Sequence, residues 1–247
     1  MADPSLGLYV VCDGMGGGNA GEIASALAVE AIHAHLVAAS CDVDLPLLDP
    51  FNHTVSAPAH RLASAIRAAN DVIYRESRSR TDYAGMGTTV VAALLSEEAL
   101  AIAHVGDSRL YLVRNGTIQS LTTDHSWVAE QILKGLITEE EAAHSPRRNI
   151  VTRALGVESW VEVELAEIPI KNGDLLLLCS DGLTSAIHPN DILHILRGSD
   201  DLPNMSDRLI SMANEAGGGD NTTVVIVALR DELQIGLWDR LKKRFAA

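Results

Sequence analysis

Hydrophobic runs separated by polar residues and glycines divide the chain into predicted strands. The runs are rich in Val, Ile, Leu and Thr and end at Gly, Asn or Asp, a pattern typical of buried β-strands. The turn Arg114-Asn115-Gly116 lies between two runs, and Asn-Gly supplies the positive φ angles of a tight hairpin, so neighbouring strands there are expected to be antiparallel. The predicted strands are Leu6–Cys12, Thr88–Leu95, Ala99–Val105, Arg109–Val113, Thr117–Leu121, Val161–Ile168, Leu175–Cys179 and Thr222–Leu229.

Helical periodicity occurs on both sides of this strand-rich middle. In Ala20–Leu36, apolar residues recur at spacings of three and four. Since strands and helices do not alternate strictly, we expect an α+β fold with antiparallel sheets. The proline-containing segment Cys41–Ala59 is predicted to be an irregular connection. The other predicted helices are Arg61–Arg75, Ser126–Lys134, Asn190–Leu196 and Met205–Glu215.

Composition narrows the function. The 247 residues, 47% of them hydrophobic, favour one domain. Asp and Glu outnumber Lys and Arg by 33 to 19, giving a formal charge of −14 that repels phosphate backbones. The 3 Trp, 4 Tyr and 2 Phe also offer few surfaces for base stacking. We therefore do not expect nucleic acid as a partner.

Cysteines and the N-terminal residues predict location. Cys12, Cys41 and Cys179 form no CxxC pair, which argues against a zinc ribbon or a dense disulfide framework. The N-terminus has no Lys or Arg before its short apolar stretch, and we expect no segment to approach the roughly 20 apolar residues of a membrane span. These features predict a soluble, cytoplasmic protein.

Aspartates stand at the ends of several predicted strands. Asp13 and Asp181 each follow a buried strand and precede a glycine, Asp220 comes after three glycines and before a strand, and Asp107 lies between two strands. Any single one of these fits an ordinary turn, the structural alternative. If the four converge, however, their repulsion requires a cation between them. An all-oxygen set without nearby Cys or His pairs favours Mg²⁺ or Mn²⁺ over Zn²⁺.

Two rival chemistries fit poorly. The glycine-rich segment 14–18 precedes a helix, as in phosphate-binding loops, but Asn19 stands where GxGxxG needs glycine and no GK[ST] follows. A cysteine phosphatase needs an Arg six residues after its nucleophile, and none of the three cysteines has one. The cysteines, like His104 and His125, are therefore expected to be structural.

The ordered motifs of the chain resemble the metal-dependent PPM (protein phosphatase 2C) family, especially its bacterial members. They run in family order from Val11 to about Leu229. The motifs are Val11-Cys12-Asp13-Gly14-Met15-Gly16-Gly17 with Ala20-Gly21-Glu22, Gly85-Met86-Gly87-Thr88-Thr89, His104-Val105-Gly106-Asp107-Ser108-Arg109, Asp124-His125-Ser126, Thr152-Arg153-Ala154-Leu155-Gly156, Cys179-Ser180-Asp181-Gly182-Leu183 and Gly219-Asp220-Asn221-Thr222-Thr223.

The resemblance implies a four-layer αββα sandwich, with two central antiparallel sheets flanked by helices. It also implies metal-dependent hydrolysis of phosphoserine and phosphothreonine in proteins, at a centre of two Mn²⁺ or Mg²⁺ ions with a weaker third site. By motif position, Asp13 bridges two metals and the Gly14 carbonyl joins one of them. Asp181 and Asp220 hold the other metal, and Asp107 with Asp181 forms the third site.

The same resemblance places a mobile flap between His125 and Gly156. Arg147 and Arg148 in this segment are candidates for contact with acidic or phosphorylated partners. A phosphatase of this class also implies signalling and a Ser/Thr kinase pathway that supplies its substrates.

The two ends of the chain raise further expectations. Family members carry an additional first strand with a phosphate-gripping Arg and an acidic metal ligand in an Asn-Glu-Asp segment, and the family-like domain, residues 1–230, lacks this strand. Asp3, followed by Pro4, is not expected to replace the ligand. This leaves open a catalytically impaired, phosphoprotein-binding regulatory relative. Residues 231–247 have a pattern that predicts an amphipathic helix, for which packing on the domain is favoured over membrane contact.

Overall fold

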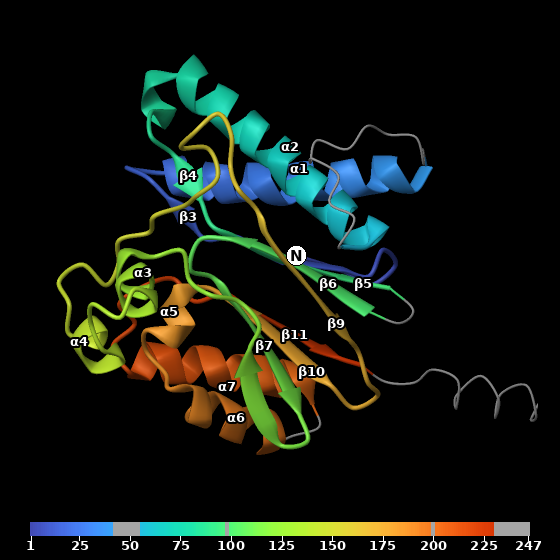
Figure 1. Cartoon of the computed structure of the whole chain (residues 1–247), viewed down its shortest axis with the longest axis vertical. Helices are drawn as coiled ribbons and strands as arrows, with labels where there is room; N and C mark the ends of the chain where they lie inside the picture. Colours follow the sequence, from blue (N-terminus) through green and yellow to red (C-terminus); the bar gives the residue numbers. More distant parts are fainter. Residues whose placement is uncertain (42–54, 97–98, 199–200, 230–247) are drawn as a thin grey trace, which may run out of the picture.

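A computed structural model describes residues 1–41, 55–96, 99–198 and 201–229. Two antiparallel sheets lie face to face between two layers of helices (Figure 1). The first sheet has the order β1-β2-β5-β6-β9 and the second the order β11-β10-β7-β8. The strands of the first sheet are β1 (Ala2–Asp3), β2 (Leu8–Val11), β5 (Val90–Leu95), β6 (Ala99–Val105) and β9 (Glu164–Pro169); those of the second are β7 (Arg109–Arg114), β8 (Thr117–Ser120), β10 (Leu175–Cys179) and β11 (Val224–Ala228).

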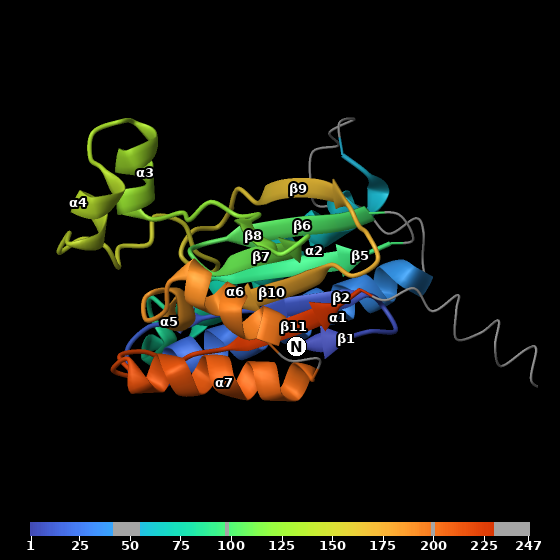
Figure 2. The same ribbon diagram turned by 90° about the horizontal axis from the view of Figure 1, so that it is seen from below.

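The helices cover the outer faces of the sheets. Helices α1 and α2 lie on the first sheet, and α6 and α7 cover the second (Figures 1 and 2). A short two-stranded ribbon of β3 (Gly14–Met15) and β4 (Gly87–Thr88) packs against α1. The helical elements are α1 (Ala20–Cys41), α2 (Ala57–Ser79), the 3₁₀ turn η1 (Thr81–Tyr83), α3 (Trp127–Leu133), α4 (Glu139–Ala143), α5 (Asp181–Thr184), α6 (Pro189–Gly198) and α7 (Leu202–Glu215).

Alternation along the strands builds three apolar layers. In β2, Leu8 and Val10 face α1 and α2, whereas Tyr9 and Val11 join the layer between the sheets. In β10, Leu176 and Leu178 join that same middle layer, while Leu177 and Cys179 face α6 and α7. Because successive strand side chains point to opposite faces, both sheets are apolar on both sides. The predicted αββα sandwich is confirmed.

The hairpin between β7 and β8 has the predicted geometry. Asn115 and Gly116 have φ angles of 52° and 78°, and Val113 and Arg114 pair with Ile118 and Thr117. A two-residue turn with both φ angles positive matches the twist of antiparallel strands. The Asn-Gly signal therefore set this register correctly.

Several predicted boundaries differ from the structure. The strand expected over Val161–Ile168 begins only at Glu164, and its first three residues form no ladder with β6. Helix α2 begins at Ala57 and α7 at Leu202, each with a proline in its first turn, where a missing N–H costs nothing. Most of the Cys41–Ala59 connection and the helix predicted at 231–247 lie outside the described residues.

The expectation about apolar segments needs correction. Residues 20–40 of α1 form a helix long and apolar enough to cross a membrane by length and composition. Much of the apolar character of this helix comes from alanine. In the structure Ala24, Ala28 and Ile32 are fully buried at a spacing of four, in the core shared with α2 and the first sheet. One face of α1 therefore packs in the core, although only 28% of its apolar window is buried in total.

Candidate metal centre

Asp13 follows β2 at the edge of the first sheet, where two threonines hold its backbone. The Asp13 N–H donates to Thr89 Oγ1 (3.0 Å), and the Asp13 carbonyl accepts from Thr89 N–H (2.8 Å) and Thr88 Oγ1 (2.9 Å). Thr89 Oγ1 in turn contacts Ser108 Oγ (2.7 Å). These bonds satisfy the peptide groups at the end of the strand and fix the Asp13 backbone.

Two glycines allow the helix to approach Asp13 closely. A Cβ atom on Gly14 would lie 1.8 Å from the Gly21 carbonyl oxygen, so no other residue fits without a backbone shift. Gly14 pairs with Thr88 in the β3–β4 ribbon, and Gly21 lies in the first turn of α1. The start of α1 therefore packs directly against the residue that follows Asp13.

Asp181 and Asp220 come together where β10 ends and β11 begins. Ser180 Oγ donates to the Asn221 carbonyl (3.2 Å) and accepts from Thr223 N–H (3.0 Å). A Cβ atom on Gly182 would lie 2.4 Å from the Asn221 carbonyl oxygen. The Ser180 hydrogen bonds thus hold the Asp181 and Asp220 loops together, and the absence of a side chain on Gly182 lets the two loops approach closely.

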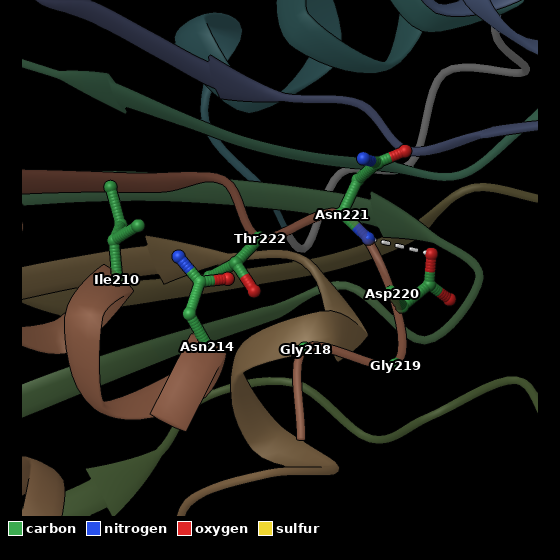
Figure 3. A pocket seen from close by; sticks show the side chains of 7 residues that line it. All are labelled: Ile210, Asn214, Gly218, Gly219, Asp220, Asn221 and Thr222. Atoms are coloured by element: carbon green, nitrogen blue, oxygen red, sulfur yellow. Dashed lines mark hydrogen bonds between the residues drawn. The ribbon is translucent and has the colours of Figure 1, made fainter. Parts of the chain in front are cut away.

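Asp220 borders an open cavity of about 490 Å³ (Figure 3). Its Oδ1 accepts a hydrogen bond from the Asn221 N–H at 2.7 Å. The rest of the lining is polar or glycine backbone from the loop 218–222, with Asn214 and Ile210 from α7. This side of the site is therefore open to a polar ligand.

Asp107 lies in the tight turn between β6 and β7. Gly106, with φ of 105°, packs against Thr89 so closely that a Cβ atom would lie 2.7 Å from the threonine side chain. Asp107 is only 8% exposed. The glycine conformation therefore turns a buried carboxyl toward the other aspartates.

The four aspartates form one electrostatic cluster. Burial raises the pKa of Asp13, and the charges of Asp181, Asp220 and Asp107 raise it further. Burial and the charge of Asp181 raise the pKa of Asp107 to about 6. The pKa of Asp181 is also raised, mainly by burial. Without a cation, Asp13, Asp107 and Asp181 hold their protons to higher pH, because burial disfavours the charged form and neighbouring carboxylates repel one another.

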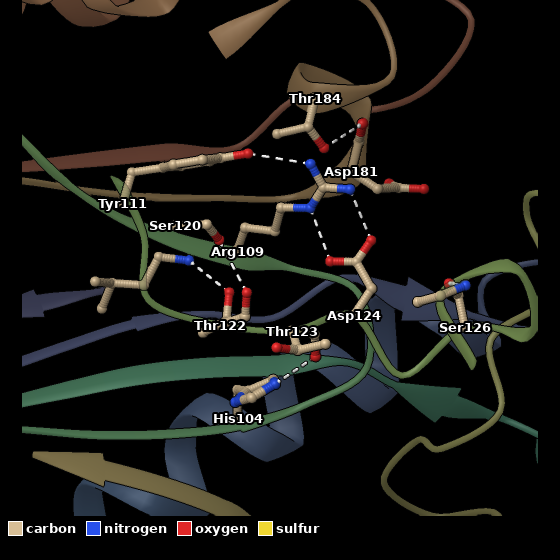
Figure 4. A network of polar contacts seen from close by, with 12 residues as sticks. His104, Arg109, Tyr111, Ser120, Thr122, Thr123, Asp124, Ser126, Asp181 and Thr184 are labelled. Carbon is tan, nitrogen blue, oxygen red and sulfur yellow. Dashed lines mark hydrogen bonds and ion pairs between the residues drawn. The ribbon is translucent and has the colours of Figure 1, made fainter. Parts of the chain in front are cut away.

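A fifth carboxylate beside the cluster is already neutralised (Figure 4). Asp124 accepts two hydrogen bonds from Arg109, from Nε and Nη2, each at 2.7 Å, and Arg109 Nη1 also donates to the Tyr111 hydroxyl (3.1 Å). A bidentate pair of this kind satisfies both ions. Asp124 is therefore a structural neighbour of the cluster, which the sequence analysis did not single out although it quoted the motif.

The donor set fits Mg²⁺ or Mn²⁺. Four carboxylates and the neighbouring Gly14 carbonyl are oxygen donors, the ligands that these hard ions prefer. A divalent cation would also remove the repulsion that raises the pKa values of Asp13 and Asp107. The sequence prediction that these residues converge therefore agrees with the structure.

A second group of ligand types is occupied by other bonds. His104, His125 and Glu164 offer three ligand atoms within 4.8 Å of one another. The two imidazoles stack with centroids 4.6 Å apart, and their parallel planes do not point at a common metal. His104 Nε2 contacts the Thr123 carbonyl (2.8 Å) and His125 Nε2 contacts Glu164 Oε2 (3.1 Å). Both histidines therefore have hydrogen-bond partners, and their structural role stays a prediction.

Other predicted residues lie elsewhere. Arg147 and Arg148 are exposed in the turn after α4, on the projecting part of the chain that carries α3 and α4 (Figure 2), and Arg147 covers the Trp127 ring at 4.9 Å. Asp3 contacts His33 and Ser5. Burial raises the pKa of both Cys12 and Cys179 to about 12, which agrees with a structural role.

Comparison with known proteins decides the family. Residues 2–228 match the family model described as protein phosphatase 2C. The chain belongs to the protein phosphatase 2C family. It is 41% identical over 229 residues to the serine/threonine phosphatase stp of Listeria monocytogenes, covering 93% of this chain and 86% of that protein.

Solved structures of this family agree. The serine/threonine phosphatase PstP/Ppp of Mycobacterium tuberculosis has a TM-score of 0.79 at 35% identity and covers 91% of this chain and 88% of its own. The catalytic domain of PstP in complex with 2 manganese ions has a TM-score of 0.76 at 36% identity, with the same shares of both chains. The family relationship and the all-oxygen site both indicate Mn²⁺ or Mg²⁺.

Some features of this phosphatase site were not predicted. The Gly87-Thr88-Thr89 motif was assigned no role from the sequence, although the two threonines hold Asp13. Helix α4 was not predicted either, despite the capping box in which Thr138 and Glu141 hydrogen-bond reciprocally. The pattern Thr-x-x-Glu before a helix was the available signal.

Proposed function

We propose that this phosphatase hydrolyses phosphoserine and phosphothreonine in proteins at the cluster formed by Asp13, Asp107, Asp181 and Asp220. The activity class, a metal-dependent serine/threonine protein phosphatase, follows from membership of the family. The observation that carries the assignment to these residues is the convergence of four carboxyl groups in one site, where burial and the neighbouring charges raise the pKa values of Asp13, Asp107 and Asp181.

Within this cluster, each residue has a proposed role. Asp13, on which the charges of the other three aspartates act, would be the ligand shared by two metals, and the Gly14 carbonyl would contribute to one of them. Asp181 and Asp220 would hold the other, and Asp107 with Asp181 would form a weaker third site. When bound, Mn²⁺ or Mg²⁺ lowers the pKa of a coordinated water and stabilises charge on the phosphoryl oxygens.

The chain's own residues do the positioning. Thr88 and Thr89 fix Asp13 through its backbone, and Ser180 fixes the loops of Asp181 and Asp220. Preorganised ligands need no rearrangement when the reaction occurs, which is the main source of electrostatic stabilisation at such sites. Met15 and Gly16 follow the Asp-Gly motif and offer no proton, so we assign protonation of the leaving group to water.

Purified protein and a phosphothreonine peptide test this assignment. We expect hydrolysis with Mn²⁺, none with excess chelator, and loss of turnover in Asp220→Asn. Asp71→Asn is the matched control, because Asp71 is a half-exposed carboxylate paired with Arg75 on α2. Normal Mn²⁺ binding by the wild-type chain without turnover would contradict the proposal.

We also propose that Arg147 and Arg148 contact the phosphoprotein outside the metal cluster. Both are exposed cations in an acidic molecule, on the projecting segment with α3 and α4. Replacing both by Ala should raise KM for a phosphoprotein severalfold and leave hydrolysis of a small aryl phosphate unchanged. Equal effects on the two substrates would contradict this role.

The proposed setting is a cytoplasmic Ser/Thr kinase pathway. The reaction consumes phosphoserine and phosphothreonine, so a kinase reaction must supply its substrates. The two described thiols, Cys12 and Cys179, are free, which fits a reducing compartment. Fractionation of cells producing the full chain tests the location, and enrichment in membranes would contradict it.

A further inference from the structure

His125 holds both polar groups of the Gly106 backbone. The His125 N–H donates to the Gly106 carbonyl (2.9 Å), and the Gly106 N–H donates to His125 Nδ1 (3.1 Å). Gly106 directly precedes Asp107 and has the positive φ angle that forms the turn. The imidazole, 7% exposed, thus acts as a built-in template for the backbone beside Asp107.

The same histidine closes the base of the projecting segment that carries α3 and α4. The His125 carbonyl accepts from Thr152 N–H (2.8 Å), Ser126 bridges to Val151, and the Trp127 N–H donates to the Ile150 carbonyl (2.8 Å). Residues 127–150 of the flap therefore leave and re-enter the domain beside His125. Its backbone faces the flap on one side and the Asp107 turn on the other.

The ring is oriented by its hydrogen bonds. Because Nδ1 accepts from an amide, it carries no proton, so the hydrogen of the neutral ring is on Nε2, which lies 3.1 Å from Glu164 Oε2 on β9 and 3.2 Å from Arg153 Nη1. Only the Glu164 carboxylate can accept this hydrogen, because a guanidinium has no acceptor. The stack on His104 holds the ring plane. A shift of the flap base must therefore move either the ring or the Gly106 amide.

We propose that His125 is a positioning residue that couples the flap to metal binding at Asp107, acting through the Gly106 amide. The inference rests on the proposed role of Asp107 as a ligand of the third metal site. Residues that orient metal ligands change metal affinity although they do not touch the ion. Coupling between two sites is reciprocal, so metal at Asp107 also restrains the flap.

Two substitutions separate the ends of the imidazole. In His125→Asn, Oδ1 takes the place of Nδ1 and still accepts from Gly106. In His125→Gln, the amide reaches the place of Nε2 and Glu164, and the Gly106 amide loses its acceptor. Both variants lose the ring stacking, so they are matched for that loss. Glu164→Gln is a further control, which alters only the Nε2 side.

Calorimetric titration of the whole chain with Mn²⁺ provides a readout besides activity. We expect the weakest Mn²⁺-binding step to weaken about tenfold in His125→Gln and to stay within about twofold of wild type in His125→Asn and Glu164→Gln. Equal weakening in the Asn and Gln variants would show a purely structural role and overturn the proposal.

Limited trypsin digestion after Arg147 and Arg148 reports on the flap. In wild type, Mn²⁺ concentrations that saturate the weakest binding step should slow this cleavage. In Asp107→Asn, the same Mn²⁺ concentrations should not slow it. This measurement tests the coupling between the flap and metal binding even if a His125 variant fails to fold. If Asp107→Asn loses the weakest Mn²⁺-binding step but filling this step in wild type does not slow cleavage, the coupling is overturned and Asp107 remains the proposed ligand. If Asp107→Asn retains the step, the ligand assignment itself fails.

Discussion

At the scale of single residues, the metal cluster depends on carboxylates that the folded chain holds close together against their repulsion. The backbone of Asp13 is bonded to Thr88 and Thr89, and Gly182 and Ser180 hold Asp181 beside Asp220. The energy of this arrangement is recovered only when a cation binds.

Asp13→Asn tests the centre of the cluster. Losing the carboxylate that we propose as the shared metal ligand should lower kcat/KM for a phosphothreonine peptide by at least about a hundredfold, because changes to residues that only orient metal ligands already cost 10–100-fold. Mn²⁺-dependent initial rates measure the effect. The same substitution should leave the metal-free protein as stable as wild type or more so at neutral pH, since it removes a repelled charge. A marked loss of stability in chelator would contradict this account of the site.

Gly182 tests the contact between the two aspartate loops. A Cβ atom in Gly182→Ala would lie 2.4 Å from the Asn221 carbonyl, so we expect a loss of about 1–3 kcal/mol in unfolding free energy and weaker Mn²⁺ binding. Gly219→Ala is the matched control, because it adjoins Asp220 but has nothing within 4 Å of its Cβ position. Denaturant melts and Mn²⁺ titrations measure both. Similar losses in the two variants would argue against the loop contact.

At the scale of elements, turns and strand ends decide which residues meet. The β7–β8 hairpin needs two residues with positive φ, and Gly116→Val should cost about 1–2 kcal/mol because a β-branched residue resists φ of 78°. The register of β7 against β10 does not depend on this turn, so Mn²⁺ affinity should not change. Asn115→Gly should be close to neutral. Chemical denaturation measures the stability of both variants. An unchanged stability in Gly116→Val would contradict the need for positive φ at this position.

At the scale of the whole molecule, metal binding and pH both act on folding through the cluster. The pKa of Asp107 rises from 3.8 to about 6 on folding, so between these values the folded state binds more protons than the unfolded state. The free energy of unfolding therefore falls as pH rises through this window, and the raised pKa of Asp13 extends the fall to higher pH.

Melting curves from about pH 4 upward in chelator should show this loss, and Mn²⁺ should reverse it. At a hundred times its Kd, a bound ion adds about 2.7 kcal/mol. Below that range, the lowered pKa of Asp174, due to its hydrogen bonds from Arg114, gives the opposite dependence, with stability lost as pH falls. Asp107→Asn should flatten the upper window. Parallel curves with and without Mn²⁺ would contradict the linkage.

Much of the fold was predictable because it depends on local patterns. Strands β6 and β10 matched their predicted bounds, since each is a continuous apolar run with two buried faces. Val161 was assigned to a strand because it is buried and apolar, but its burial comes from packing against the α2 side of the core. A run of apolar residues cannot distinguish a ladder from a packed loop.

The sequence by itself determined the α+β class with antiparallel strands, the hairpin and the four aspartates at strand ends, because apolar runs, turn chemistry and glycine position are local properties. The four layers were expected only from the family resemblance. Only the tertiary structure decided how those aspartates meet. The contacts of Gly182 with Asn221, of Thr89 with Asp13 and of His125 with Gly106 join residues 19 to 76 positions apart. They depend on packing distances of a few ångströms, which no periodicity along the chain records.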